Sequence, residues 1–270
     1  GNSMILGGGA LEEAAFTPES ISNIALWLKV NTNITADENS AGVAYGTEHT
    51  SNGGDMVNGD RINAWNAAGG TSINATQGTT GDKPRWDTGT GYLGGIKSPG
   101  ANKHMDLSSA ITFDANTDFT VVIRFNPDTV ATNRGLLGDT DSEFIRNQDA
   151  DTIRFKTDGA THDFNSATPM QDDKIITMIM VRSDGSTGNV NCFMRSNVSS
   201  YFDGTATGTA FGSTVQDTEE IIISNILAQA DDSGEWHGHV FDVIIYDGTA
   251  VTSKQRKQLF DYIDAQDYPQ

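Results

Sequence analysis

The chain is poor in cysteine and in basic residues, and it has no long apolar run. Cys192, a single cysteine among 270 residues, excludes an intrachain disulfide and any cysteine-rich metal site. A chain of this length buries enough apolar surface to fold without disulfides. Cys192 lies in the strand-like residues 190–194, so we expect it to be a small core residue. No run of about 18 apolar residues occurs, so we expect no membrane-spanning segment.

The charge balance is strongly acidic. The chain has 17 Lys and Arg against 36 Asp and Glu, a net charge of −19. This balance argues against binding to nucleic acids and to anionic membranes, which select basic surfaces. It fits a solvated surface, a cation site or a basic partner.

The N-terminal residues lack the features of a secretory signal, because no basic residue precedes their short apolar patch. We therefore expect the chain to stay inside the cell or to leave it by another route, such as within an assembled virus. Residues 1–15, with Gly7-Gly8-Gly9 at their centre, are expected to form a flexible arm. The arm is either disordered throughout or docked on a neighbouring subunit through Met4, Ile5 and Leu6.

The residues from 236 to 263 predict a strand followed by a helix. Residues 240–246 are mostly β-branched or aromatic, which favours a strand, and Asp247-Gly248 predicts a turn after it. Thr252 and Gln255 have the spacing of a capping box at the start of a helix. Leu259 and Ile263 lie four residues apart and would share the buried face of that helix.

Short strands separated by turn residues are predicted along most of the remaining chain. Residues 118–125 alternate most clearly, and residues 175–182 form an apolar run suited to a strand buried on both faces. Residues 31–60 have few apolar residues and are interpreted as a long loop or a pair of weak hairpins. Further strands are expected at residues 24–30, 61–66, 91–93, 105–107, 135–138, 143–146, 152–155, 189–195 and 221–226. This pattern predicts an all-β sandwich or jelly roll.

Two stretches resemble concanavalin A-like (laminin-G-like) jelly-roll domains. In the last strand and helix the matching residues are Gly238, Val240, Asp242, Val243, Ile245, Tyr246 and Tyr262. Near the N-terminus, Thr17-Pro18 begins a short helical turn and Leu26-Trp27 lies in the strand that follows. The resemblance implies a jelly-roll β-sandwich over residues 16–270, with a short N-terminal helical turn and one C-terminal helix. The first and last strands would meet in one sandwich.

The N-terminal match is especially similar to virion proteins of tailed bacteriophages. It implies a non-enzymatic virion surface protein, either a capsid decoration or a tail or fibre component. Its partners would be other virion proteins in a homo-oligomer or larger assembly, and its location the virion. The alternative is a carbohydrate-binding lectin module, calcium-dependent or not, that recognises host-surface glycans.

Enzyme motifs are absent from the sequence. Glucanases of this fold use Glu-x-Asp-x-x-Glu on one strand, which places paired carboxylates on one face, and no such string occurs here. Gly-x-Ser-x-Gly, His-Glu-x-x-His and phosphate-loop motifs are missing too. We therefore predict that the chain is not an enzyme.

Candidate ligand-binding residues are the aromatic side chains of Trp86, Tyr201 and Trp236, on which a sugar could stack; each also fits a packing role. Calcium is the candidate cofactor, since hard cations select several loop oxygens. Its candidate ligands are Asp139, Asp141 and Glu143, with Asp231 and Asp232 as a second set. His237 and His239 lack a third metal ligand and are expected to pack at the surface or between subunits.

Overall fold

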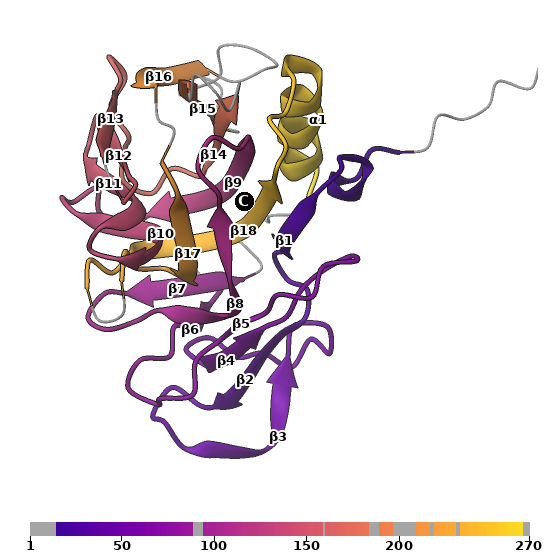
Figure 1. Ribbon diagram of the computed structural model, residues 1–270. Helices are drawn as coiled ribbons and strands as arrows, with labels where there is room; N and C mark the ends of the chain where they lie inside the picture. The colour runs from indigo at the N-terminus through magenta and orange to yellow at the C-terminus, as the bar shows by residue number, and fades with distance from the viewer. Residues whose placement is uncertain are drawn as a thin grey trace, which may run out of the picture.

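The computed structural model describes residues 15–88, 94–158, 160–183, 189–196, 219–230 and 233–266, and the backbone of residues 209–216. In these residues two antiparallel β-layers lie face to face, and a smaller sheet extends below them (Figure 1). The helix α1 (Ser253–Asp264) packs beside the upper part of the molecule. No helix in the described part of the chain is both long and apolar enough to cross a membrane.

The first layer contains the first and the last strand of the chain. Its order follows the antiparallel pairs β1–β18, β18–β9, β9–β14, β14–β15 and β15–β16. The strands are β1 (Ile24–Leu28), β18 (His237–Asp247), β9 (Phe119–Pro127), β14 (Ile176–Ser183), β15 (Asn189–Ser196) and β16 (Thr209–Gln216). The pairing of β1 with β18 confirms that the first and last predicted strands meet.

The second layer covers the inner face of the first. Its strands follow the antiparallel order β13–β12–β11–β10–β17–β8. They are β13 (Thr161–Asn165), β12 (Thr152–Lys156), β11 (Glu143–Asp149), β10 (Arg134–Thr140), β17 (Ile221–Ile226) and β8 (Met105–Phe113). Between the layers lies a core that includes Phe113, Phe119, Phe125 and Phe155, all fully buried.

The small sheet, which we call the side sheet, joins both layers at one end of the sandwich. Its strands are β2 (Ile34–Glu38), β3 (Ala44–Thr50), β4 (Arg61–Trp65), β5 (Ala75–Thr76) and β6 (Arg85–Asp87). β2 pairs with β3 and β4, and β4 pairs with β5 and β6. β5 continues to β8 of the second layer, while β6 pairs with β7 (Gly95–Pro99), which reaches β18 of the first layer.

A second apolar cluster lies between the outer face of the first layer and α1. Leu259, Phe260 and Ile263 of the helix are buried there against Trp27 and Ile244. The predicted capping box begins the helix: the Gln255 backbone N–H donates to Thr252 Oγ1 at 3.2 Å, and the Thr252 N–H donates to Gln255 Oε1 at 2.9 Å. The short 3-10 helix η1 (Pro18–Ser20) lies nearby, where Tyr246 donates its hydroxyl to the Pro18 carbonyl at 2.9 Å.

The predicted fold class is confirmed: the described chain is an all-β jelly-roll sandwich with a short helical turn near its start and a helix near its end. Of the two alternatives left open for residues 31–60, the structure has a hairpin, formed by β2 and β3, and not one long loop. β7 lies between the strands predicted at residues 91–93 and 105–107, where the sequence pattern predicted no strand. The predicted strand at residues 91–93 and the arm residues Met4, Ile5 and Leu6 lie outside the described residues.

Candidate functional site

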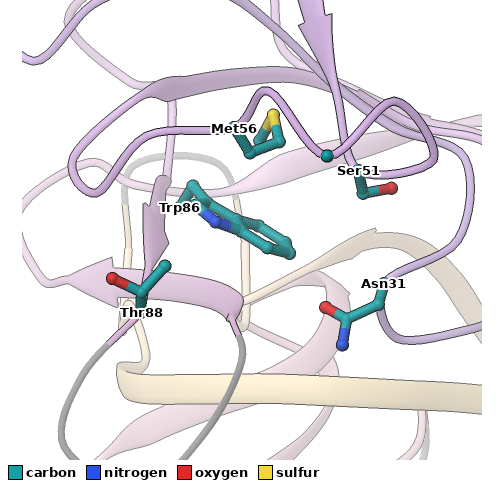
Figure 2. Close-up of a pocket in the computed structure, with 6 residues that line it drawn as sticks. Asn31, Ser51, Met56, Trp86 and Thr88 are labelled. Atoms are coloured by element: carbon teal, nitrogen blue, oxygen red, sulfur yellow. The ribbon is translucent and has the colours of Figure 1, made fainter.

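A pocket of about 250 Å³ opens where the side sheet meets the first layer (Figure 2). Its walls come from separate segments: the turn after β1, the loop between β3 and β4, and strand β6. The lining residues are Asn31, Ser51, Gly54, Met56, Trp86 and Thr88. All of them are uncharged, and none is a histidine, a cysteine or a carboxylate.

Trp86 forms the centre of the pocket wall. It is the middle residue of β6, so its side chain points inward while Arg85 and Asp87 point the other way. Its backbone is fixed on both sides, because its N–H donates to the Asp60 carbonyl at 2.8 Å and its carbonyl accepts from the Gly59 N–H at 2.7 Å. Only 4% of Trp86 is exposed, so a ligand reaches part of the indole and not a whole open face.

Gly94 fits closely against this indole. Its φ is +143°, and a Cβ at this position would lie 2.0 Å from Cζ2 of Trp86. A real Cβ does not approach another atom so closely, so a side chain here would displace the ring. Glycine at this position is therefore needed to keep Trp86 in the pocket wall.

Asn31 supplies the polar side of the pocket. Its φ is +52°, a left-handed conformation that asparagine tolerates better than most residues. Its turn is held from two sides: Trp65 Nε1 donates to the Lys29 carbonyl at 3.0 Å, and the Val30 N–H donates to Asp242 Oδ1 at 3.2 Å. The amide oxygen Oδ1 of Asn31 is buried, and it has no hydrogen-bond partner in the described part of the chain.

The loop between β3 and β4 is fixed by its own polar side chains. The Ile34 N–H donates to Ser51 Oγ at 3.0 Å, and the Thr50 N–H donates to Asp55 Oδ1 at 2.6 Å. Asp60 is 1% exposed and accepts from the Val57 N–H at 2.9 Å. These bonds hold Ser51, Gly54 and Met56 in place, so the pocket is formed before a ligand arrives.

Of the predicted ligand-binding aromatic residues, Trp86 lines this pocket and Trp236 does not. Trp236 is 1% exposed, packs edge-on against Phe125 at 5.3 Å, and donates Nε1 to the His239 carbonyl at 3.3 Å. It is a core residue, so its assignment as a sugar-stacking platform was wrong. Tyr201 lies outside the described residues.

The predicted calcium ligands do not gather into a site. Glu143 Oε1 accepts from the Ile222 N–H at 3.0 Å, and Asp141 Oδ1 accepts from Gln229 Nε2 at 2.6 Å and from Ser233 Oγ at 3.0 Å. Asp139 lies in β10 and forms a backbone bridge to Ala230. Over the described ranges, no group of three or more His, Cys, Asp or Glu residues could hold a metal ion. Asp231 and Asp232 lie outside those ranges.

His239 is fully buried, which corrects the expectation of a surface or subunit contact for this residue, whereas His237 is partly exposed. Its Nε2 lies 2.7 Å from Asp87 Oδ2 and its Nδ1 lies 3.6 Å from Asp128 Oδ1. Burial lowers the pKa of His239, although both carboxylates oppose that change. This cluster joins β6, β18 and the residue that follows β9, so we interpret it as structural.

The comparisons with known proteins concern the fold. No protein-family model and no curated protein sequence matches this chain. One similar structure is domain 4 of AbnA, a GH43 extracellular arabinanase from Geobacillus stearothermophilus, in complex with arabinotriose, at 11% identity and a TM-score of 0.45 over 88% of this chain and 98% of that chain.

Two further structures are similar to part of the chain. The SAP-like pentraxin of Limulus polyphemus has 14% identity and a TM-score of 0.42, over 59% of this chain and 76% of that chain. The Ruminococcus gnavus IT-sialidase CBM40 bound to α2,3-sialyllactose has 12% identity and a TM-score of 0.39, over 59% and 98%. The functional argument below rests on the pocket of this chain.

Sequence reasoning missed most of the pocket. It selected Trp86 but not Asn31, Ser51, Met56 or Thr88, which lie in segments without apolar periodicity. A partial signal was available in Asn31 and Asn33, because asparagines directly after a strand are typical of left-handed turns. That signal predicts a turn and not which side chain points into a pocket.

Proposed function

We propose that this chain is a non-catalytic carbohydrate-binding protein whose sugar site is the pocket lined by Trp86. The observation that carries this proposal is the pairing of a fixed indole with the unpartnered amide oxygen of Asn31 in one preformed pocket. Sugars present C–H groups that pack on aromatic rings and hydroxyl or amide groups that need hydrogen-bond partners. A site with both elements, held rigidly, binds such ligands without a cost of reorganisation.

The pocket's size and neutrality define the ligand further. About 250 Å³ is below the range of roughly 300–1,000 Å³ typical of sites that enclose drug-sized molecules. One sugar unit, or part of one, therefore enters, and the rest of a glycan would extend into solvent. None of the six lining residues carries a charge, so we expect a neutral ligand group and binding that does not require calcium.

A blocking variant tests the proposal without disturbing the core. Thr88 is exposed at the pocket wall, so Thr88→Phe should fill the opening while the chain stays folded. Thr168→Phe places the same substitution at an exposed position outside the pocket lining. On a glycan array and by calorimetry, we expect the unaltered chain and Thr168→Phe to bind the same glycans with equal affinity. For Thr88→Phe, we expect the affinity for those glycans to fall by at least about tenfold.

Two results would contradict the proposal: the absence of binding to any glycan, or binding that Thr88→Phe leaves unchanged. Circular dichroism and thermal melting establish that both variants are folded. Addition of EDTA separates calcium-dependent binding, which we do not expect at this pocket, from direct recognition.

A role on a bacteriophage virion stays a prediction from the sequence. It rests on the resemblance around Thr17-Pro18 and Leu26-Trp27, and it is compatible with recognition of host-surface glycans. The virion partners, the homo-oligomeric assembly and the virion location belong to the same prediction. Mass spectrometry of purified phage particles tests it, since a virion protein is present there in stoichiometric amount.

A further inference from the structure

We propose that the pocket selects sugars that carry an acetamido group, with the acetyl methyl against Trp86 and the amide N–H donated to Asn31 Oδ1. This inference rests on the proposed sugar-binding function and specifies its ligand. It follows from the shape of the pocket, from the buried amide oxygen of Asn31 that faces it and from the directions of the Ser51 and Thr88 hydroxyls.

The first step concerns the apolar walls. Figure 2 shows the Trp86 indole between Met56 and Thr88, with the Thr88 hydroxyl directed away from the ring. Since only 4% of Trp86 is exposed, a pyranose ring cannot lie flat on the indole. A small apolar substituent can reach it, and a methyl group is the smallest that gains from leaving water.

The second step concerns the acceptor. Figure 2 shows the amide oxygen of Asn31 on the side that faces Trp86, while the Ser51 hydroxyl points away from the indole. Ser51 Oγ already accepts from the Ile34 N–H, whereas Asn31 Oδ1 has no partner within the described segments. A buried acceptor without a partner is costly, so the ligand group that enters should be a hydrogen-bond donor.

The third step combines the two requirements. An acetamido group carries a methyl and an N–H on one planar unit, so a single substituent can contact the apolar wall and satisfy Asn31. A hydroxyl alone would donate a hydrogen bond to Asn31 but would leave the apolar walls in contact with water. The methyl group of a 6-deoxy sugar would cover those walls, but a separate ring hydroxyl would then have to reach Asn31 Oδ1. The acetamido carbonyl would face the open mouth, where water can donate to it.

The experiment compares N-acetylglucosamine with glucose, which differ only at this substituent, and includes fucose as a methyl-bearing sugar without the amide. Calorimetry gives the affinities, and saturation-transfer NMR shows which ligand protons contact the protein. We expect N-acetylglucosamine to bind at least about tenfold more tightly than glucose and fucose. Its acetyl methyl should receive the strongest saturation.

Asn31→Gly tests the acceptor directly, because glycine tolerates the φ of +52° and removes the amide. We expect this variant to lose most of the preference for N-acetylglucosamine over glucose. Asn116→Gly is the matched control, since Asn116 is an exposed asparagine with a φ of +62° outside the pocket lining. It should keep the full preference.

The outcomes separate this inference from the proposed function. Equal affinity for N-acetylglucosamine and glucose, with Thr88→Phe weakening both, would refute the acetamido inference and leave the sugar site standing. Tighter binding of fucose, or a preference that survives in Asn31→Gly, would refute it as well. If no sugar binds to the unaltered chain, both proposals fail.

Discussion

Strands β9 and β3 show how differently the sandwich and the side sheet are built. All nine residues of β9 are buried, with apolar residues towards both the inner core and α1. In β3 no residue is buried, and the strand pairs with β2 on one edge. Burial of apolar side chains therefore stabilises β9, whereas β3 depends on backbone pairing and on polar side chains at its ends.

Two groups of polar side chains, around Lys83 and around Asp60, hold the side sheet together. Lys83, which is 2% exposed, donates to Asp37 Oδ1 at 2.8 Å and to Glu38 Oε1 at 2.6 Å. Asp60 accepts from the Tyr45 hydroxyl at 2.5 Å and lies 2.9 Å from His49 Nδ1. The candidate sugar pocket lies between the two kinds of structure, with an apolar wall from Trp86 and a polar loop opposite it.

The largest expected effect tests whether the side sheet depends on the sandwich core. Trp65 of β4 is fully buried in the same cluster as Leu28 and Ile96. Trp65→Ala should lower the free energy of unfolding by about 3–5 kcal/mol in one cooperative transition. Trp27→Ala, in the cluster under α1, should have a similar effect. Denaturant unfolding in which Trp65→Ala shifts one of two separate transitions would show that the side sheet folds independently.

The second prediction concerns the ion cluster of the side sheet. Burial raises the pKa of Glu38, but the hydrogen bonds from Lys83 and Thr80 outweigh it and hold that pKa below its usual value. Lys83→Met leaves the buried carboxylate without its ammonium partner, so we expect a loss of about 2–3 kcal/mol. Lys254→Met, at an exposed helix position, is the control and should be nearly neutral. Equal stability of the two variants in urea would contradict the prediction.

The third prediction concerns Asp242, a buried carboxyl group on the face of β18 that is turned towards α1. Burial raises the pKa of Asp242 from 3.8 to about 7, although Arg124 and the Val30 N–H oppose this rise. Between these pH values the folded chain holds a proton that the unfolded chain has released, so the contribution of Asp242 to stability falls as pH rises from about 4 to about 7. At about 1.4 kcal/mol per pKa unit, we expect a loss on the order of 4 kcal/mol over this interval.

Asp242→Asn should remove this contribution, because an amide does not titrate. Urea unfolding at a series of pH values gives the free energy of unfolding of each protein against pH. The contribution of Asp242 is the difference between the slopes of these two curves. Parallel curves for Asp242→Asn and the unaltered chain would show that Asp242 does not titrate in this range.

The same contrast explains what the sequence could predict. The strands β9, β14 and β18 were predicted because their apolar residues alternate or run together, and that pattern follows from burial. Strand β3 has the composition of a loop, because both of its faces meet solvent. It contains Tyr45, Gly46 and Glu48 and shows no apolar alternation. β7, which is mostly buried, was missed for a different reason: it begins with a glycine and ends with a proline, residues typical of turns.

The candidate site was predictable only in part, for geometric reasons. Trp86 was selected for its residue type, but Trp236 was selected on the same ground and does not line the pocket. Which of two tryptophans reaches a pocket depends on contacts between distant strands, which a local pattern does not contain. Asn31 has its role because Trp65 and Asp242, far away in the sequence, hold its turn in place.

The smallest expected effect is at the tip of the side sheet. Tyr45 stacks on His49 at 3.8 Å, and burial together with the hydrogen bond to Asp60 raises the pKa of Tyr45 to about 12. Tyr45→Phe keeps the stacking and removes the hydroxyl, while Asp60 retains His49 and the Val57 N–H. We therefore expect a loss of about 1 kcal/mol, near the contribution of one hydrogen bond. If the Asp60 cluster fixes the β3–β4 loop, the single variant His49→Phe should lower the free energy of unfolding by more than Tyr45→Phe does. If both variants have the same free energy of unfolding in urea as the unaltered chain, backbone pairing alone holds β3 in place. The polar contacts that stabilise the side sheet would then be those around Lys83.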